Sequence, residues 1–204
     1  MKINELIQDL KTKIELNSFE KLFETNIHFN REILLNEVNS DVANAIETLI
    51  RFWNRADEEN NIPREEREPI KFFIDSPGGE LVAAFTLINA IELSKTPVWT
   101  INIGAAYSAG FFIFIAGHKR VSYPLASFLF HEGSTGGGFY DAHKFRNQAD
   151  FYNKQLQQLK EHTLKYTNIS EKEYQTIMKD DYWLTAEEAI EKGVADEIAK
   201  EFIL

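Results

Sequence analysis

Cysteine is absent from this chain of 204 residues. The absence excludes disulfide bonds, a thiolate nucleophile and cysteine-ligated metal sites, and it is compatible with a reducing compartment. Long apolar runs are also missing, because the most apolar segment, 109–116, is far shorter than the roughly 20 residues that cross a bilayer. The first residues lack the apolar core of a secretory signal. We therefore expect a cytoplasmic protein with no membrane partner.

Positive charge is scarce relative to negative charge. The chain has 22 Lys and Arg against 32 Asp and Glu, and its formal net charge is −10. A nucleic-acid partner is therefore not expected. None of the five histidines has metal-ligand spacing, and no phosphate-binding loop is present. The sequence predicts no metal and no cofactor.

Strand-like and helix-like hydrophobic patterns alternate along the chain. We expect strands at 33–35, 70–74, 97–103, 121–123, 128–130 and 194–198, and helices at 42–53, 81–91, 109–116 and 144–166. This alternation predicts an α/β fold of right-handed βαβ units with a mainly parallel sheet. The charged segments 54–69 and 117–120 should be exposed loops. Residues 1–30 should form a helical extension, 31–204 a single domain, and the polar helix 144–166 should project from it.

Two turns stand where a strand-like run gives way to a helix-like one, at 76–79 and 104–110. Backbone amides at such a turn have no intrahelical partner and can hold a developing negative charge. Ser108 lies in the second turn among small residues, so a substrate carbonyl could approach its hydroxyl. Ser108 could instead be a small residue that lets helix and sheet pack closely. Gly79 could donate to an oxyanion, or could serve an ordinary tight turn.

A general base and its orienting acid have candidates later in the chain. His131 closes the apolar run 128–130 just before a glycine-rich segment, a typical place for a catalytic group. It could equally be a core histidine satisfied by a backbone carbonyl. Asp180 or Asp181 could orient the imidazole, or both could be solvated, and spacing alone does not choose. Gly136 and Gly137 could leave a strand edge for an extended peptide, or could form a floppy loop.

Together these segments resemble the proteolytic subunit of the Clp protease, the ClpP family of serine peptidases, over about 30–198. Four motifs in the family's order carry the resemblance: Ser76-Pro77-Gly78-Gly79, Gly104-Ala105-Ala106-Tyr107-Ser108-Ala109-Gly110, Phe130-His131, and Asp181-Tyr182-Trp183-Leu184-Thr185-Ala186-Glu187-Glu188-Ala189.

The resemblance implies a crotonase-like fold, a Ser108–His131–Asp181 triad and an oxyanion hole at Gly79 and Ala109. It selects Asp181 over Asp180. It also implies an acyl-enzyme endopeptidase acting on unfolded proteins or peptides. Of the two interpretations of Gly136 and Gly137, we adopt peptide binding for such a substrate. Family members assemble into heptameric rings, which pair into a tetradecamer through a "handle" helix such as 144–166, and an AAA+ unfoldase supplies substrate.

Several positions depart from the family's pattern. Tyr107 stands where the family usually has alanine, Ala109 where it has methionine, and Asp180 where an arginine often helps to join the rings. We interpret the chain as a divergent member, of a stand-alone or prophage type. The alternative is a non-catalytic ring component with a misaligned triad. An acyl-CoA lyase or hydratase using Glu80, or a Ser–Lys peptidase, is a more remote hypothesis.

Overall fold

The computed structural model describes residues 30–131, 133, 142–177 and 180–203. The expected helical extension over 1–30 lies almost wholly outside these residues, as do Gly136 and Gly137. The described elements are β1 (Glu32–Leu35), α3 (Ser40–Glu59), the 3-10 helix η1 (Arg64–Glu66), β2 (Ile70–Ser76), α4 (Leu81–Leu93), β3 (Val98–Tyr107), α5 (Ala109–Ile115), β4 (Lys119–Ser122), β5 (Ser127–Phe130), α6 (Ala142–Tyr166), α7 (Glu171–Ile177), β6 (Tyr182–Thr185), α8 (Ala186–Glu191) and β7 (Glu197–Ile198).

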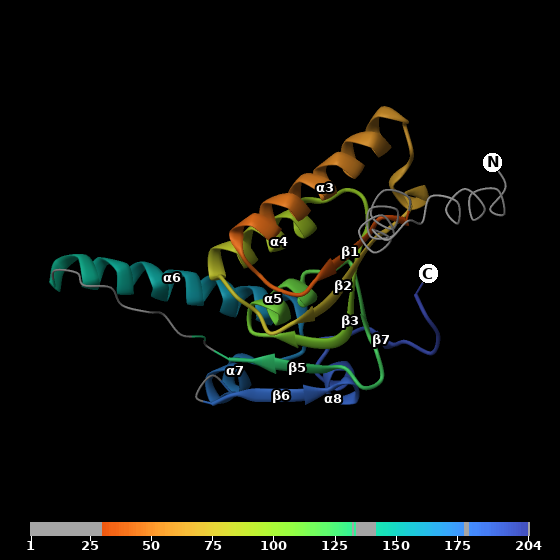
Figure 1. Ribbon diagram of the computed structural model, residues 1–204. Coiled ribbons are helices and arrows are strands. Elements are labelled where there is room, and N and C mark those ends of the chain that lie inside the picture. The colour runs from red at the N-terminus through yellow and green to blue at the C-terminus, as the bar shows by residue number, and fades with distance from the viewer. Residues whose placement is uncertain (1–29, 132, 134–141, 178–179, 204) are drawn as a thin grey trace, which may run out of the picture.

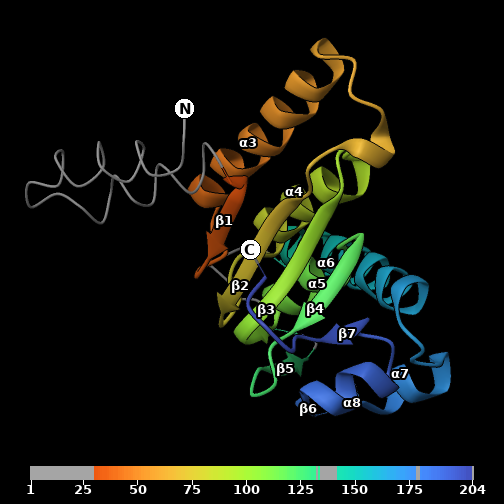
Figure 2. The ribbon, with the colours of Figure 1, turned by 90° about the vertical axis from the view of Figure 1, so that its right-hand side faces the viewer.

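The strands form one mixed sheet whose main path is β1-β2-β3-β4-β7, with parallel pairing throughout that path. The long strand β3 divides its pairing: its first half pairs with β4 and its second half with β5. Strand β6 then pairs with β5 in the antiparallel sense (Figure 1), and Figure 2 shows strands β1 to β4 of the main path side by side. The α/β fold with a mainly parallel sheet is therefore confirmed.

Asn102 lies where the pairing of β3 divides. The buried side-chain amide of Asn102 donates a hydrogen bond to the backbone carbonyl of Ser127 at 2.9 Å. The backbone carbonyl of Asn102 accepts from the N–H of Tyr123 at 2.8 Å. Because buried backbone groups need partners, this side chain satisfies the β5 strand at the point where β4 leaves β3.

Helix α5 forms the centre of the core. All of its residues are buried, and it contacts β2, β3, β5, α4 and α6. A helix that is apolar all round must be buried on every side, so this prediction is confirmed. Along β2 the buried residues Ile70, Phe72 and Ile74 alternate with residues on the other face of the sheet, as the two-residue period of a strand requires.

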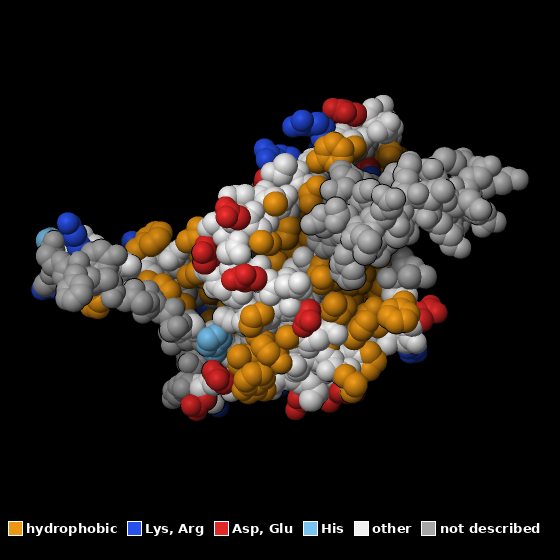
Figure 3. Space-filling view, in the orientation of Figure 1, with side chains coloured by type: hydrophobic (Ala, Val, Ile, Leu, Met, Phe, Trp, Pro, Cys, Tyr) orange, Lys and Arg blue, Asp and Glu red, His pale blue; other side chains and the backbone are white. Residues whose placement is uncertain are grey.

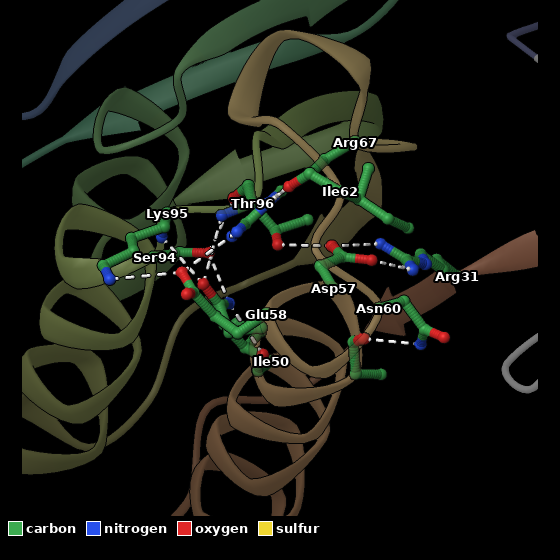
Figure 4. A network of polar contacts seen from close by, with 12 residues as sticks. Arg31, Ile50, Asp57, Glu58, Asn60, Ile62, Arg67, Ser94, Lys95 and Thr96 are labelled. Atoms are coloured by element: carbon green, nitrogen blue, oxygen red, sulfur yellow. Dashed lines mark hydrogen bonds and ion pairs between the residues drawn. The ribbon is translucent and has the colours of Figure 1, made fainter.

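The prediction of an exposed loop over 54–69 is wrong. Helix α3 continues to Glu59, and the acidic side chain of Asp57 is only 1% exposed. Arg31 donates to both carboxylate oxygens of Asp57 at 2.6 and 2.9 Å, and the Thr96 hydroxyl donates at 2.6 Å (Figure 4). A buried charge is stable when it is paired and hydrogen-bonded. The charged residues of this segment therefore take part in a polar network that connects α3 with Arg31 and Thr96.

Two further boundaries differ from expectation, and two elements are additional. Lys119 and Arg120 belong to β4 and not to an exposed turn, and the last strand is only Glu197–Ile198. Helix α7 and strand β6 were not expected. These short elements depend on partners far away in the chain, as where Val121 of β4 pairs with Glu197 of β7. The local pattern of hydrophobic residues therefore does not predict such pairing.

Helix α6 extends beyond the rest of the molecule (Figure 1). Its first part is mainly exposed, whereas Leu159 and Thr163 near its end are buried. There the His162 ring hydrogen-bonds the carbonyl of Phe112 through Nε2 at 2.9 Å and lies 3.2 Å from Glu92 through Nδ1. Burial lowers the pKa of His162 and outweighs the opposing effects of Phe112 and Glu92.

Within the described ranges, no helix has the length and apolar character to span a membrane.

Candidate active site

The carboxyl ends of β3 and β5 lie side by side and carry two of the candidate residues. Tyr107, the last residue of β3, pairs with Leu129 of β5 in parallel register. The N–H of Ser108 then donates to the carbonyl of Leu129 at 2.9 Å. Because Ser108 directly follows β3 and His131 directly follows β5, the two residues leave the sheet at the same edge.

The antiparallel strand β6 brings Asp181 to the same edge. Phe130 pairs with Tyr182, so the next position on each strand, His131 and Asp181, faces the other. Nδ1 of His131 lies 3.9 Å from Oδ1 of Asp181, and the two side chains are 31% and 59% exposed. This separation suits an ion pair and is too long for a hydrogen bond. The histidine therefore makes this contact with Asp181 and is not enclosed in the core.

Ser108 has a strained backbone. Its φ of 53° and ψ of −119° are unusual for a residue with a side chain, and such conformations cost about 1–3 kcal/mol. The strain arises because the chain turns from β3 into α5 within one residue. Nucleophiles of hydrolases occupy comparable sharp strand-to-helix turns, where the side chain is presented outward. Within the described residues, Ser108 and His131 share no direct hydrogen bond; such bonds are often long in unliganded enzymes.

The Gly78–Gly79 turn packs directly on Ser108. A Cβ at Gly78 would lie 2.8 Å from the Ser108 Cβ and 3.0 Å from the Ala109 nitrogen. Both glycines have positive φ angles, 104° and 151°, which favour glycine. Bulk is therefore excluded from the surface that faces Ser108.

Val38 fixes the orientation of the Gly79 peptide. The N–H of Val38 donates to Gly78 and its carbonyl accepts from Glu80, so Gly79 forms an isolated parallel bridge with Val38. In such a bridge the N–H of the central residue points away from its partner. Among the described residues, no hydrogen bond uses the N–H of Gly79 or of Ala109. Two amides without a partner among the described residues therefore lie close to the Ser108 turn.

The sequence reasoning missed two contributors to this region, Val38 and an aromatic contact between Tyr107 and Trp183. A possible signal for the second was the alternation of side chains along 127–130 and 182–185, which places Leu129 and Trp183 on the face away from the core. Val38 had no local signal, because its role depends on a backbone bridge to a distant turn. No cluster suited to a metal ion is found in the part of the chain that the structure describes.

Comparison with known proteins gives two findings. The family model described as Clp protease matches residues 15–202. The chain is also similar to the ATP-dependent Clp protease proteolytic subunit 2 of Treponema denticola. The two are 27% identical over a region that covers 97% of this chain and 94% of that protein.

Proposed function

Because the chain belongs to the Clp protease family, we propose that it is a serine endopeptidase in which Ser108, His131 and Asp181 form the catalytic triad. One observation carries the proposal: the ends of β3, β5 and β6, far apart in sequence, place these three residues at one edge of the sheet. The contact between His131 and Asp181 supports their assignment as base and orienting acid.

The proposed reaction proceeds through an acyl-enzyme. Nδ1 of His131 faces Asp181, which leaves Nε2 to take the proton of the Ser108 hydroxyl as its oxygen attacks the scissile carbonyl. His131 then gives this proton to the leaving amine as the peptide C–N bond breaks. Water, deprotonated by His131, attacks the ester; the acid product leaves and the proton returns to Ser108.

Gly79 and Ala109 are the proposed donors to the oxyanion. Their N–H groups have no partner among the described residues and lie at the two turns that meet at Ser108. Donors that are fixed before the reaction stabilise the developing charge without reorganisation. The bridge between Val38 and Gly79 would supply that fixation.

The substrates in this proposal are unfolded proteins or peptides, and the cleavage takes place inside a chamber made of heptameric rings, which pair into a tetradecamer. Family membership and the exposed aromatic side chains of Phe145 and Phe151 on α6 support an oligomer. Peptide binding at Gly136 and Gly137, delivery by an AAA+ unfoldase and a cytoplasmic location stay predictions of the sequence.

Labelling with a fluorophosphonate tests the nucleophile. The purified full chain should be labelled at Ser108 and should hydrolyse peptides. The Ser108→Ala variant should be neither labelled nor able to hydrolyse peptides. Ser170→Ala is the matched control, because Ser170 caps α7 and lies in another part of the fold. A wild-type assembly that resists labelling, or a Ser108→Ala variant labelled as strongly as the wild type, would count against the proposal.

A non-catalytic ring component is the second candidate. The 3.9 Å separation of His131 and Asp181, and the lack of a direct hydrogen bond between Ser108 and His131 in the described region, favour it. The native mass, measured in the same fractions as labelling per protomer, separates the two. A ring with no reactive serine would be the non-catalytic form.

A further inference from the structure

Three side chains form a row across β3, β5 and β6 next to the candidate triad. Tyr107 pairs with Leu129, and Leu129 pairs with Trp183. The rings of Tyr107 and Trp183 meet edge to face, with centroids 5.2 Å apart and planes at 81°. Because paired residues on neighbouring strands point to the same face of a sheet, these side chains form one continuous surface.

This row directly adjoins two residues of the candidate triad, His131 and Asp181, on the same face. His131 follows Leu129 by two residues and Asp181 precedes Trp183 by two, so each has the same orientation as its neighbour in the row. Two residues along a strand span about 7 Å. Ser108 directly follows Tyr107. A peptide whose scissile carbonyl met Ser108 would therefore place a neighbouring side chain within reach of the row.

The row is open to solvent, unlike the opposite face of the same strands. Trp183 is 53% exposed and Tyr107 and Leu129 are partly exposed, whereas Phe128, Phe130 and Leu184 are buried against the core. In the space-filling view, hydrophobic side chains gather over β5 and β6 beside a histidine and acidic side chains (Figure 3). A single exposed aromatic side chain is common on protein surfaces. Two aromatic side chains in contact with each other beside a reactive site are typical of a binding surface.

The Tyr107 ring is held in place before any ligand binds. Its hydroxyl shares a hydrogen bond with the Ser127 hydroxyl at 2.7 Å, and its ring contacts Trp183. The hydroxyl of the tyrosine therefore already has a hydrogen-bond partner within the protein, and the rest of the side chain is an apolar ring. A rigid apolar surface binds an apolar group without the entropic cost of ordering its own side chains.

We propose that Tyr107 and Trp183 form a specificity subsite that receives an apolar side chain of the substrate, next to the scissile bond. This inference rests on the proposed peptidase function. The occupant is a substrate side chain and not a second copy of the protein, because the surface is continuous with the candidate triad.

Steady-state kinetics on matched peptides test the subsite. The peptides would differ only at the residues flanking the scissile bond, with leucine or phenylalanine in one set and alanine or serine in the other. Tyr107→Ala and Trp183→Ala should each reduce the preference for the apolar set about tenfold in kcat/KM, mainly through KM. Tyr107→Phe and Trp183→Phe, which keep a ring, should retain most of the preference.

Controls distinguish failure of this inference from failure of the peptidase proposal. Phe52→Ala removes an exposed aromatic of α3 and should leave the preference unchanged. Fluorophosphonate labelling of Ser108 in each variant reports whether the triad works. If labelling is normal and all peptides lose activity in equal proportion, the subsite is wrong although the peptidase stands. A lower native mass with unchanged preference would overturn it too, since the row would then be an interface between copies. Absent wild-type labelling defeats the peptidase proposal itself.

Discussion

At the scale of single residues, the candidate site depends on which atoms the turns leave free. Gly79 illustrates this, because a Cβ there would lie 2.0 Å from the carbonyl oxygen of Val38. Only glycine fits, and the bridge with Val38 leaves its N–H directed elsewhere. A glycine that looks like an ordinary turn residue in the sequence is thus held in one orientation next to the Ser108 turn.

The two adjacent acids, Asp180 and Asp181, give a residue-scale prediction. Asp181→Asn keeps the shape of the side chain but removes the charge that would stabilise the imidazolium of His131, so kcat should fall by about 10³–10⁴. Asp180→Asn is the matched control and should behave like the wild type. Initial rates of peptide hydrolysis measure both variants. Equal losses in the two variants would show that Asp181 has no special role.

At the scale of elements, a polar network joins the end of α3 to β1 and to the connection between α4 and β3. Arg31 and Thr96 bind Asp57 (Figure 4). The Asn54 side chain donates to Ser94 and accepts from the N–H groups of Lys95 and Thr96. Since β3 ends at the candidate nucleophile, the network anchors the far end of the strand that carries it.

Asp57 provides the element-scale prediction. Asp57→Asn leaves the Arg31 charge poorly compensated in a largely buried place, so the free energy of unfolding should fall by about 3–5 kcal/mol. Glu47→Gln is the control, because it breaks an exposed pair with Arg51 on the same helix and should cost less than about 1 kcal/mol. Urea unfolding monitored by circular dichroism measures both losses. Similar losses in the two variants would contradict the importance of the network.

The same carboxylate predicts a pH dependence of stability. Burial raises the pKa of Asp57, but hydrogen bonds from Arg31 and Thr96 and the charges of Arg31 and Arg67 outweigh it and hold the pKa below its ordinary value. The folded state then binds fewer protons than the unfolded state, so stability falls with acid. The contribution is complete above about pH 4 and is lost as pH falls through the folded pKa. The difference in unfolding free energy between wild type and Asp57→Asn should narrow over that range.

At the scale of the whole molecule, the exposed surface of α6 is the feature that a monomer explains least well. Phe145 and Phe151 are mostly exposed side chains in the first half of α6, the helix that extends from the body (Figure 1). Contiguous exposed apolar side chains are typical of interaction surfaces, so we expect this face of α6 to be covered in the proposed assembly. The end of the helix is instead held against α5 through Leu159 and His162.

Replacing both aromatics tests the assembly. Phe145→Glu combined with Phe151→Glu should lower the native mass measured by light scattering after size exclusion. The helix should stay folded, because neither side chain is part of the core. Lys154→Glu, at an exposed position of the same helix, makes the same change of two charge units and should preserve the mass. An unchanged mass in the double variant would exclude this surface from the assembly.

The sequence alone determined the order of the main elements and the identity of the family. Period and composition were sufficient where an element is apolar all round, as in α5, or where the stabilising contact is local, as in the capping box of Thr185 and Glu188. Four separate motifs then pointed to Ser108, His131 and Asp181 before any of these was placed in space.

Tertiary structure decided what depends on contact between distant segments. The charged residue Asp57 became buried because Arg31 and Thr96 meet it there, and β6 exists because β5 pairs with it. The contact between Tyr107 and Trp183, and the bridge between Val38 and Gly79, have the same origin. Local propensity cannot encode such pairing, since the energy of each contact belongs to two segments at once.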